Sequence, residues 1–267
     1  MKLFYRKYGD GPPLIILHGL YGSSDNWVSI AKKIADSYTV YLPDLRNHGH
    51  SSHSDVHDYN SMREDLYELV KELKLKKIFL AGHSMGGKVA ISFALKWPEM
   101  INGLLIADIS PFENETFAQS AYNQHLLILN AILSIDLSTI KSRNEVDLLL
   151  SENIHSEKIR GLIMKNLHRN TENNFSWKIN GVSLRNNLHN IMSSLEHPSS
   201  YIHPVTGFPV IFLKGEESEY ISQSDFRDIK RLFPAVEFVR VENAGHWIQA
   251  DRPEIVEKNL VKLLNDN

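Results

Sequence analysis

The chain has 267 residues, a length that suits one large α/β domain or a core with an insertion, and its hydrophobic content of 42% can fill such an interior. Its net charge of −3 gives no electrostatic basis for binding nucleic acid or an anionic membrane, so we expect neither as a partner. There is no cysteine, which excludes disulfides and thiolate chemistry. No stretch has the length and apolarity of a signal peptide or a membrane span, so we expect a cytoplasmic protein.

Short apolar runs alternate with segments of helical periodicity up to residue 111 and again after residue 203. The expected strands are residues 3–8, 14–17, 38–42, 77–81, 101–109, 209–213 and 236–241. Among the expected helices, one has a capping box formed by Ser61 and Glu64, and the last starts at Pro253. This alternation predicts an α/β fold with a mostly parallel sheet covered by helices on both faces. Active sites in such sheets form at the carboxyl ends of the strands.

The alternation is interrupted between residues 112 and 203, where the periodicity is helical and the strand signal is weak. We therefore expect residues 1–111 and 204–267 to form the core, and residues 112–203 to form an inserted helical lid over the active site. Candidates from this segment to line an acyl pocket are Leu126, Leu129, Ile132 and Trp177. For any one of them, burial in the lid's own core is the commoner outcome.

Residues 77–90 combine a strand, a tight turn and a helix around the pattern G-x-S-x-G, which Gly82, Ser84 and Gly86 supply. Glycines on both sides let the turn be sharp enough to hold Ser84 in a strained conformation, with its hydroxyl above the sheet edge. The backbone N–H of Met85 begins the following helix, where partial positive charge favours an oxyanion. The same pattern occurs in ordinary strand-to-helix turns, but its position after a buried strand favours a serine nucleophile.

A serine hydroxyl needs a base to take its proton, and His246 is the best candidate among 13 histidines. It lies in a glycine-containing loop after the last expected strand, and the order serine, acid, histidine is the one expected for this type of fold. For the oxyanion hole we expect the backbone N–H of Leu20 to act with that of Met85. Gly19 would let the backbone approach the substrate carbonyl closely; its alternative role is a plain tight turn.

The acid of such a site must accept the other ring N–H of the histidine. Its usual place in such folds is the loop before the last strand, three residues past a glycine, where this chain has Ser218 between Glu217 and Glu219. Ser218 cannot carry the charge. Asp108, which ends the expected strand 101–109, can carry it, although an aspartate before Ser110 also suits a turn or a helix cap. Glu217 and Glu219 remain the alternatives on the later loop.

Other polar residues of these loops are expected to be structural. His18, His48 and His83 are predicted to shape loops and are not candidates for the base. Asp44 and Arg46 are predicted to form an ion pair that ties neighbouring loops together.

Four motifs in this order resemble the α/β-hydrolase fold superfamily. They are His18-Gly19, Asp44-Leu45-Arg46-Asn47-His48-Gly49, Gly82-His83-Ser84-Met85-Gly86-Gly87 and Gly245-His246-Trp247. More narrowly, the chain is similar to YbfF-type acyl esterases through Arg46-Asn47-His48-Gly49, Ala107-Asp108-Ile109-Ser110-Pro111 and Glu217-Ser218-Glu219-Tyr220. The resemblance implies a triad of Ser84, Asp108 and His246, with Ser218 as an accessory residue near the histidine. It also implies hydrolysis of short to medium acyl esters, and of acyl-CoA thioesters.

Other reactions of the same triad are the main alternatives, namely carbon–carbon bond hydrolysis, lactone opening and cofactor-free perhydrolysis. A serine nucleophile argues against haloalkane dehalogenase and epoxide hydrolase chemistry, which use an aspartate there. A non-catalytic ligand receptor is an alternative from another class, and the retained serine, histidine and carboxylate weigh against it. The sequence has no recognisable metal-ligand cluster or phosphate-binding loop, so we expect no cofactor and no metal. The expected partner is a small acyl ester or thioester.

Overall fold

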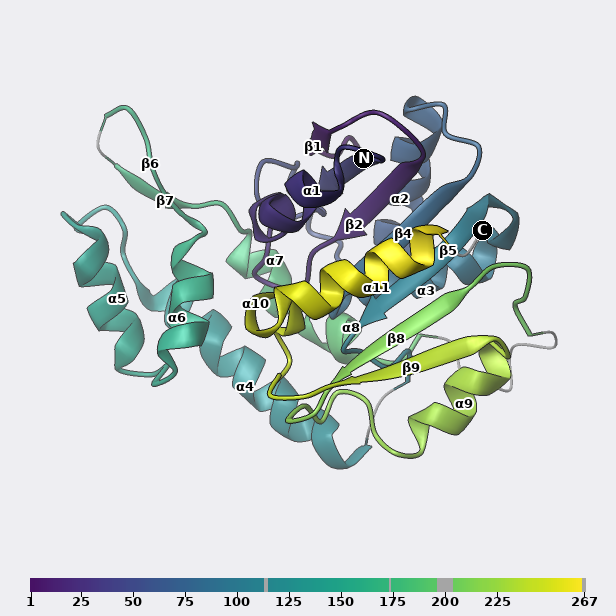
Figure 1. The fold of residues 1–267 in the computed structure, drawn as a ribbon. Coiled ribbons are helices and arrows are strands. Elements are labelled where there is room, and N and C mark those ends of the chain that lie inside the picture. The colour runs from purple at the N-terminus through teal and green to yellow at the C-terminus, as the bar shows by residue number, and fades with distance from the viewer. Residues whose placement is uncertain (113–114, 173, 196–203, 266–267) are drawn as a thin grey trace.

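A seven-stranded sheet forms the centre of the computed structural model, which describes residues 1–112, 115–172, 174–195 and 204–265 (Figure 1). The strands, in their order across the sheet, are β1 (Tyr5–Tyr8), β3 (Thr39–Pro43), β2 (Pro13–Leu17), β4 (Ile78–His83), β5 (Ile101–Ala107), β8 (Val210–Gly215) and β9 (Val236–Val241). β1 is antiparallel to β3, and the other neighbouring strands of this sheet are parallel. The predicted mostly parallel α/β sheet is therefore confirmed.

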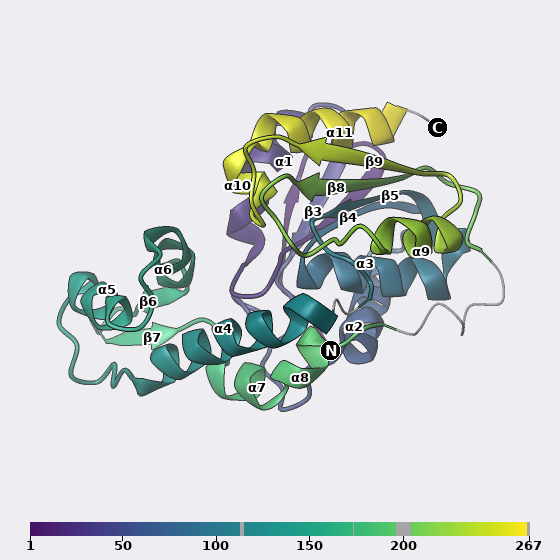
Figure 2. The ribbon, with the colours of Figure 1, turned by 90° about the horizontal axis from the view of Figure 1, so that it is seen from below.

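Helices cover both faces of this sheet (Figure 2). α1 (Val28–Ile34), α10 (Ile248–Asp251) and α11 (Pro253–Asn265) lie on one face, and α2 (Tyr59–Glu72), α3 (Met85–Lys96) and α9 (Asp225–Leu232) lie on the other. The alternation of side chains along β2 explains why a fully apolar strand is needed here. Ile15 and Leu17 pack with the α2 and α3 side, whereas Leu14 and Ile16 pack with the α1 and α11 side. In the part of the chain that the structure describes, no helix is long and apolar enough to cross a membrane.

The ends of several elements differ from the predicted ends. α2 begins at Tyr59, because Asp58 is its N-cap and accepts the Ser61 N–H at 2.7 Å. The predicted capping box of Ser61 and Glu64 is therefore wrong, and the helix starts earlier. The strand expected over residues 101–109 ends at Ala107, since Asp108 has a positive φ of 52° and turns the chain out of the sheet. Short 3₁₀ turns, η1 (Ser24–Trp27) and η2 (Pro98–Met100), precede α1 and β5.

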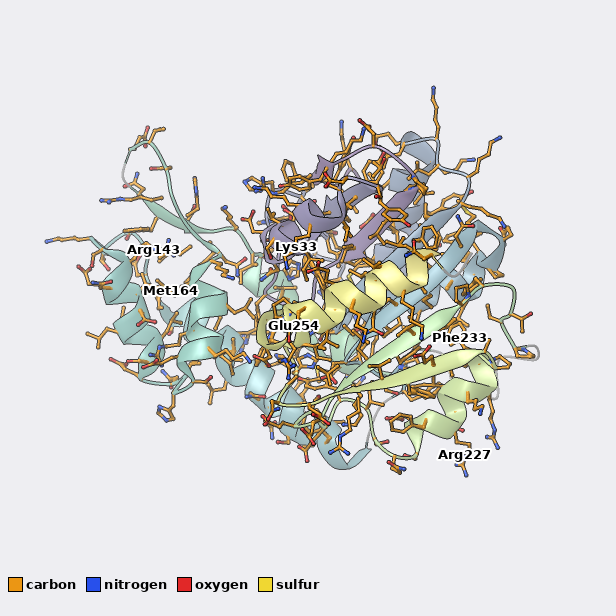
Figure 3. All side chains as sticks on the ribbon, in the orientation of Figure 1. Lys33, Arg143, Met164, Arg227, Phe233 and Glu254 are labelled. Atoms are coloured by element: carbon orange, nitrogen blue, oxygen red, sulfur yellow. The ribbon has the colours of Figure 1, made fainter. Side chains whose placement is uncertain are left out.

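Between β5 and β8 the chain forms a mostly helical insertion that extends to one side of the sheet (Figure 1). Its elements are α4 (Glu115–Ser134), α5 (Arg143–Ser151), α6 (Glu157–Met164), β6 (Leu167–Arg169), β7 (Phe175–Trp177), α7 (Gly181–Asn186) and α8 (Leu188–Met192). The short β6–β7 hairpin has no counterpart in the prediction. Arg143 joins it to the helices, since its guanidinium donates to the carbonyls of Met164 and Leu167 (Figure 3).

Long helix α4 begins at the core and runs out toward α5, and along its length it contacts α7 and α8 (Figure 2). The division into a core of residues 1–111 and 204–267 and a lid of residues 112–203 stays a prediction. Residues 113–114, 173 and 196–203 of the predicted lid lie outside the described residues.

Candidate active site

Ser84 sits at the sharp turn between β4 and α3. Its φ of 53° is in the left-handed region, which is strained for a residue with a side chain. Glycines make the turn possible, because a Cβ on Gly82 would lie 2.3 Å from the carbonyl oxygen of Gly86. A Cβ on Gly86 would lie 2.5 Å from the carbonyl oxygen of His18. Ser84 is the N-cap residue of α3 but does not cap it with its side chain, which leaves the hydroxyl available for another partner.

The three residues proposed from the sequence as a triad come together in one hydrogen-bonded line. Ser84 Oγ lies 2.9 Å from His246 Nε2, and His246 Nδ1 lies 2.8 Å from Asp108 Oδ2. They follow three different strands, β4, β5 and β9, and meet at the carboxyl edge of the sheet. With Nδ1 donating to the carboxylate, Nε2 carries no proton and accepts the serine hydroxyl, an assignment that the network dictates.

Asp108 is fully buried and accepts hydrogen bonds on both oxygens. Oδ1 accepts the backbone N–H of Gly215 at 2.9 Å, and Oδ2 accepts the Ser218 hydroxyl together with the His246 ring N–H. Ser218 therefore supports the aspartate directly and the histidine only through it. Glu217 and Glu219 are exposed, so neither side chain occupies the space beside the imidazole.

His246 is held from several sides. Its own carbonyl oxygen accepts the Nε2–H of His83 at 2.7 Å. Burial lowers the pKa of His83 well below its usual value, so the His83 ring stays neutral. On the other side, the ring of Tyr220 stacks on the imidazole with 3.7 Å between centroids and 18° between planes. These contacts fix the plane of the His246 ring.

Tyr220 belongs to a chain of hydrogen bonds that the sequence did not predict. His125, from α4, lies 3.3 Å from the Tyr220 hydroxyl through Nε2 and 3.2 Å from the Tyr21 hydroxyl through Nδ1. Because a neutral imidazole offers one donor and one acceptor nitrogen, this ring links the two phenols. Burial, and then the charge on His246, lower the pKa of His125 to about 4. The chain connects the insertion, the loop after β2 and the loop after β8; nothing in the local sequence marks His125.

The loop after β2 approaches Ser84 closely. A Cβ on Gly19 would lie 2.8 Å from His83 Nδ1 and 3.1 Å from the Ser84 side chain, which explains the glycine. His18 fixes the loop, because its Nε2 accepts the Leu45 N–H at 2.9 Å and its Nδ1 donates to the Gly19 carbonyl. Leu20 and Met85, the expected oxyanion donors, both line the cavity that contains Ser84.

That cavity has a volume of about 50 Å³ and is largely apolar. Its lining combines core and insertion residues, namely Leu20, Tyr59, Ser84, Met85, Lys88, Ile109, Phe112, Phe117, Ala118, His125, Ile191, Met192 and Tyr220. None of the four candidates Leu126, Leu129, Ile132 and Trp177 is among these lining residues. Leu129 and Ile132 are buried in the core of the insertion, because helical periodicity alone does not distinguish the face of α4 toward the cavity from the face toward the other helices.

The predicted ion pair of Asp44 and Arg46 is wrong. The Arg46 guanidinium instead binds Asp65 of α2 through both carboxylate oxygens, at 2.6 and 2.8 Å. Asp44 accepts the backbone N–H groups of Ser24 and His50 at 2.6 and 2.9 Å. Both residues are therefore structural, but they brace different loops. Across the described ranges, no group of three histidine, aspartate or glutamate side chains is arranged to hold a metal ion.

The family model of the alpha/beta hydrolase fold matches residues 12–253, and the chain belongs to this family. A solved structure titled marine microorganism esterase is 42% identical, covers 98% of this chain and 99% of its own, and superposes with a TM-score of 0.92. The sn-1-specific diacylglycerol lipase ABHD11 of Danio rerio is 36% identical over 92% of this chain and 76% of its own length. Esterase YbfF of Escherichia coli is 26% identical over 95% of this chain and 93% of its own length. The predicted resemblance to YbfF-type esterases is confirmed.

Proposed function

We propose that this protein is a serine hydrolase that cleaves carboxylic esters through an acyl-enzyme intermediate. The observation that carries the proposal is the unbroken line of hydrogen bonds from Ser84 through His246 to Asp108. Relatives named lipase or esterase support an ester substrate. Acyl thioesters are a second proposed substrate class, because the same acyl-enzyme forms when a thiolate leaves.

In the acylation step, Ser84 Oγ attacks the ester carbonyl carbon while His246 Nε2 takes the hydroxyl proton. Asp108 stabilises the imidazolium that forms. Its hydrogen bond with His246 Nδ1 also keeps a proton on that nitrogen, so that Nε2 is free to take the serine proton. The imidazolium then gives the proton to the leaving alkoxide as the carbon–oxygen bond breaks. The alcohol departs and the acyl group stays on Ser84.

The backbone N–H groups of Leu20 and Met85 are the proposed donors to the carbonyl oxygen as it gains negative charge. Met85 is the first residue of α3, so its N–H points out of the helix N-terminus and the helix dipole adds to the stabilisation. In the second half of the reaction, water attacks the acyl-enzyme, His246 takes its proton, and Ser84 leaves with that proton restored.

We also propose that residues 112–203 act as a lid. Phe112, Phe117 and His125, with Ile191 and Met192 from its other end, line the cavity that contains Ser84. A lid in this position would exclude bulk water from the acyl group and shape the acyl-binding surface.

The first test combines covalent labelling with turnover. The wild-type protein should react with a fluorescent fluorophosphonate and hydrolyse p-nitrophenyl acetate, and Ser84→Ala should lose both activities because no activated hydroxyl remains. A variant of an exposed residue away from Ser84, such as Lys96→Gln at the far end of α3, should label as the wild type does. Ester hydrolysis at a wild-type rate by Ser84→Ala would exclude Ser84 as the nucleophile. A wild-type protein that neither labels nor turns over would favour a non-catalytic ligand receptor.

A further inference from the structure

The cavity beside Ser84 is small. Lys88 donates its backbone N–H to the carbonyl of Ser84 at 3.0 Å, so it lies one helical turn further along α3, about 6 Å from the nucleophile in the direction of the axis. Both residues line the cavity. Its volume of about 50 Å³ is far below the roughly 300–1,000 Å³ of common ligand pockets.

The end of helix α8 closes this space at the level of Lys88. Ile191 and Met192 are its last cavity-lining residues, and core side chains hold the carbonyl groups there. The Tyr59 hydroxyl donates to the Ile191 carbonyl at 2.6 Å, and Lys88 Nζ donates to the Ser193 carbonyl at 2.7 Å and to the Met192 carbonyl at 3.4 Å. The ammonium group also lies 5.4 Å from the centre of the Tyr59 ring.

The hydrogen bonds from Tyr59 and Lys88 to the end of α8 are costly to break, because both side chains are buried. Tyr59 and Lys88 are both buried, with 7% and 4% of their surface exposed. A buried ammonium group that leaves its acceptors must find others or lose solvation, and the carbonyls of Met192 and Ser193 at the C-terminus of α8 are good acceptors for a cation. Moving α8 outward to lengthen the cavity would break these hydrogen bonds together.

We propose that the acyl pocket takes short chains, from acetyl to butyryl, and that Tyr59 and Lys88 set this limit by holding the end of α8 across the pocket. The inference rests on the proposed esterase function and names the acyl substrates of that same site. Acyl groups from acetyl to butyryl are small, which suits a cavity of this size. A longer chain has to displace Met192 or Ile191, and with them the carbonyls that Tyr59 and Lys88 bind.

The experiment measures kcat/KM of the purified protein on p-nitrophenyl acetate, butyrate, octanoate and laurate, below the concentrations at which these esters form micelles. We expect the maximum at acetate or butyrate and a fall of roughly tenfold or more by octanoate, since one methylene too many in a closed pocket already has an effect of that size. A maximum at octanoate or laurate would overturn the short-chain inference. In that case hydrolysis itself would still support the proposed esterase function, whereas absence of turnover on every ester would contradict it.

Variants test the role of the α8 contact. Met192→Ala removes the side chain at the end of the pocket, and Lys88→Met keeps the length of the side chain while removing the donors to the Ser193 and Met192 carbonyls. Both should raise the octanoate-to-butyrate ratio of kcat/KM several-fold. Tyr59→Phe, which loses one hydrogen bond, should raise it less. The matched control is Val182→Ala, an exposed position of α7 outside the pocket, which should leave the ratio unchanged.

Thermal unfolding of each variant separates selectivity from loss of fold. A structural effect alone would lower activity on all esters in proportion, whereas the proposed positioning role changes the ratio. An unchanged ratio in folded Met192→Ala and Lys88→Met would refute the role of this contact.

Discussion

Replacing Asp108 by asparagine tests the acid assignment most sharply. Asparagine keeps the shape, but its amide nitrogen is a donor where two donors, Ser218 and the His246 ring, now point at one oxygen. If the carboxamide nitrogen faces His246, the ring must place its proton on Nε2, where it can no longer accept the Ser84 proton. The corresponding change in a serine protease lowers kcat about 10⁴-fold, equivalent to about 5.4 kcal/mol of transition-state stabilisation, and we expect a similar loss here.

The assay is the initial rate on p-nitrophenyl acetate, with Ser218→Ala as the comparison variant. Ser218→Ala removes one hydrogen bond to the carboxylate and leaves the charge and the Gly215 N–H contact in place, so a loss of roughly tenfold is expected. Fluorophosphonate labelling of Asp108→Asn should slow in parallel with turnover, because both depend on the same proton transfer. An active Asp108→Asn beside an inactive Glu217→Gln or Glu219→Gln would move the acid to the later loop and refute the reasoning.

Two predictions concern stability. His125 and His57 are buried and neutral in the fold, with pKa values lowered from 6.5 to about 4 and about 3 by burial, so the unfolded chain binds more protons below pH 6.5. The free energy of unfolding, measured by urea titration, should therefore fall on acidification from pH 6.5 toward 4, by up to about 1.4 kcal/mol per pH unit for each histidine, and His125→Gln should make the dependence shallower. A slope unaffected by His125→Gln would contradict the assignment. Asp65→Asn should lower the free energy of unfolding by about 3–5 kcal/mol, because it leaves the buried Arg46 guanidinium without its carboxylate. The control Asp25→Asn, in an exposed ion pair, should change it by about 1 kcal/mol or less, and equal effects of the two variants would show that burial of the pair is unimportant.

Local patterns were sufficient to predict the elements that carry Ser84, Asp108 and His246. The apolar run before Ser84 predicts a buried strand, and the glycines on both sides of Ser84 predict a sharp turn into a helix. Both predictions follow from local geometry, because a Cβ on Gly82 or Gly86 would collide with the backbone. The position of Asp108 at the end of β5 followed from strand–helix alternation, as did that of His246 after β9. These inferences needed only neighbours in the sequence and the rule that parallel strands share one carboxyl edge.

Contacts between distant segments were not predictable in this way. Arg46 binds Asp65 and not the nearby Asp44, because α2 places the Asp65 carboxylate against the guanidinium. The Asp44 carboxylate instead accepts backbone N–H groups from two loops. The stacking of Tyr220 on His246 likewise depends on how the loop after β8 meets the loop after β9. The β6–β7 strands are three residues each, too short to give an alternating pattern.

The place of the histidine in the chain has a consequence for biosynthesis. Ser84 and His246 are 162 positions apart, and His246 follows β9, the edge strand that pairs with β8. At about 5–20 residues per second, the ribosome adds that stretch in roughly 8–32 s. During this interval the nascent chain holds Ser84 without His246, so under the proposed mechanism it has no base to activate the serine. If His246 is the base, recovery of esterase activity on refolding would accordingly report docking of the C-terminal edge of the sheet.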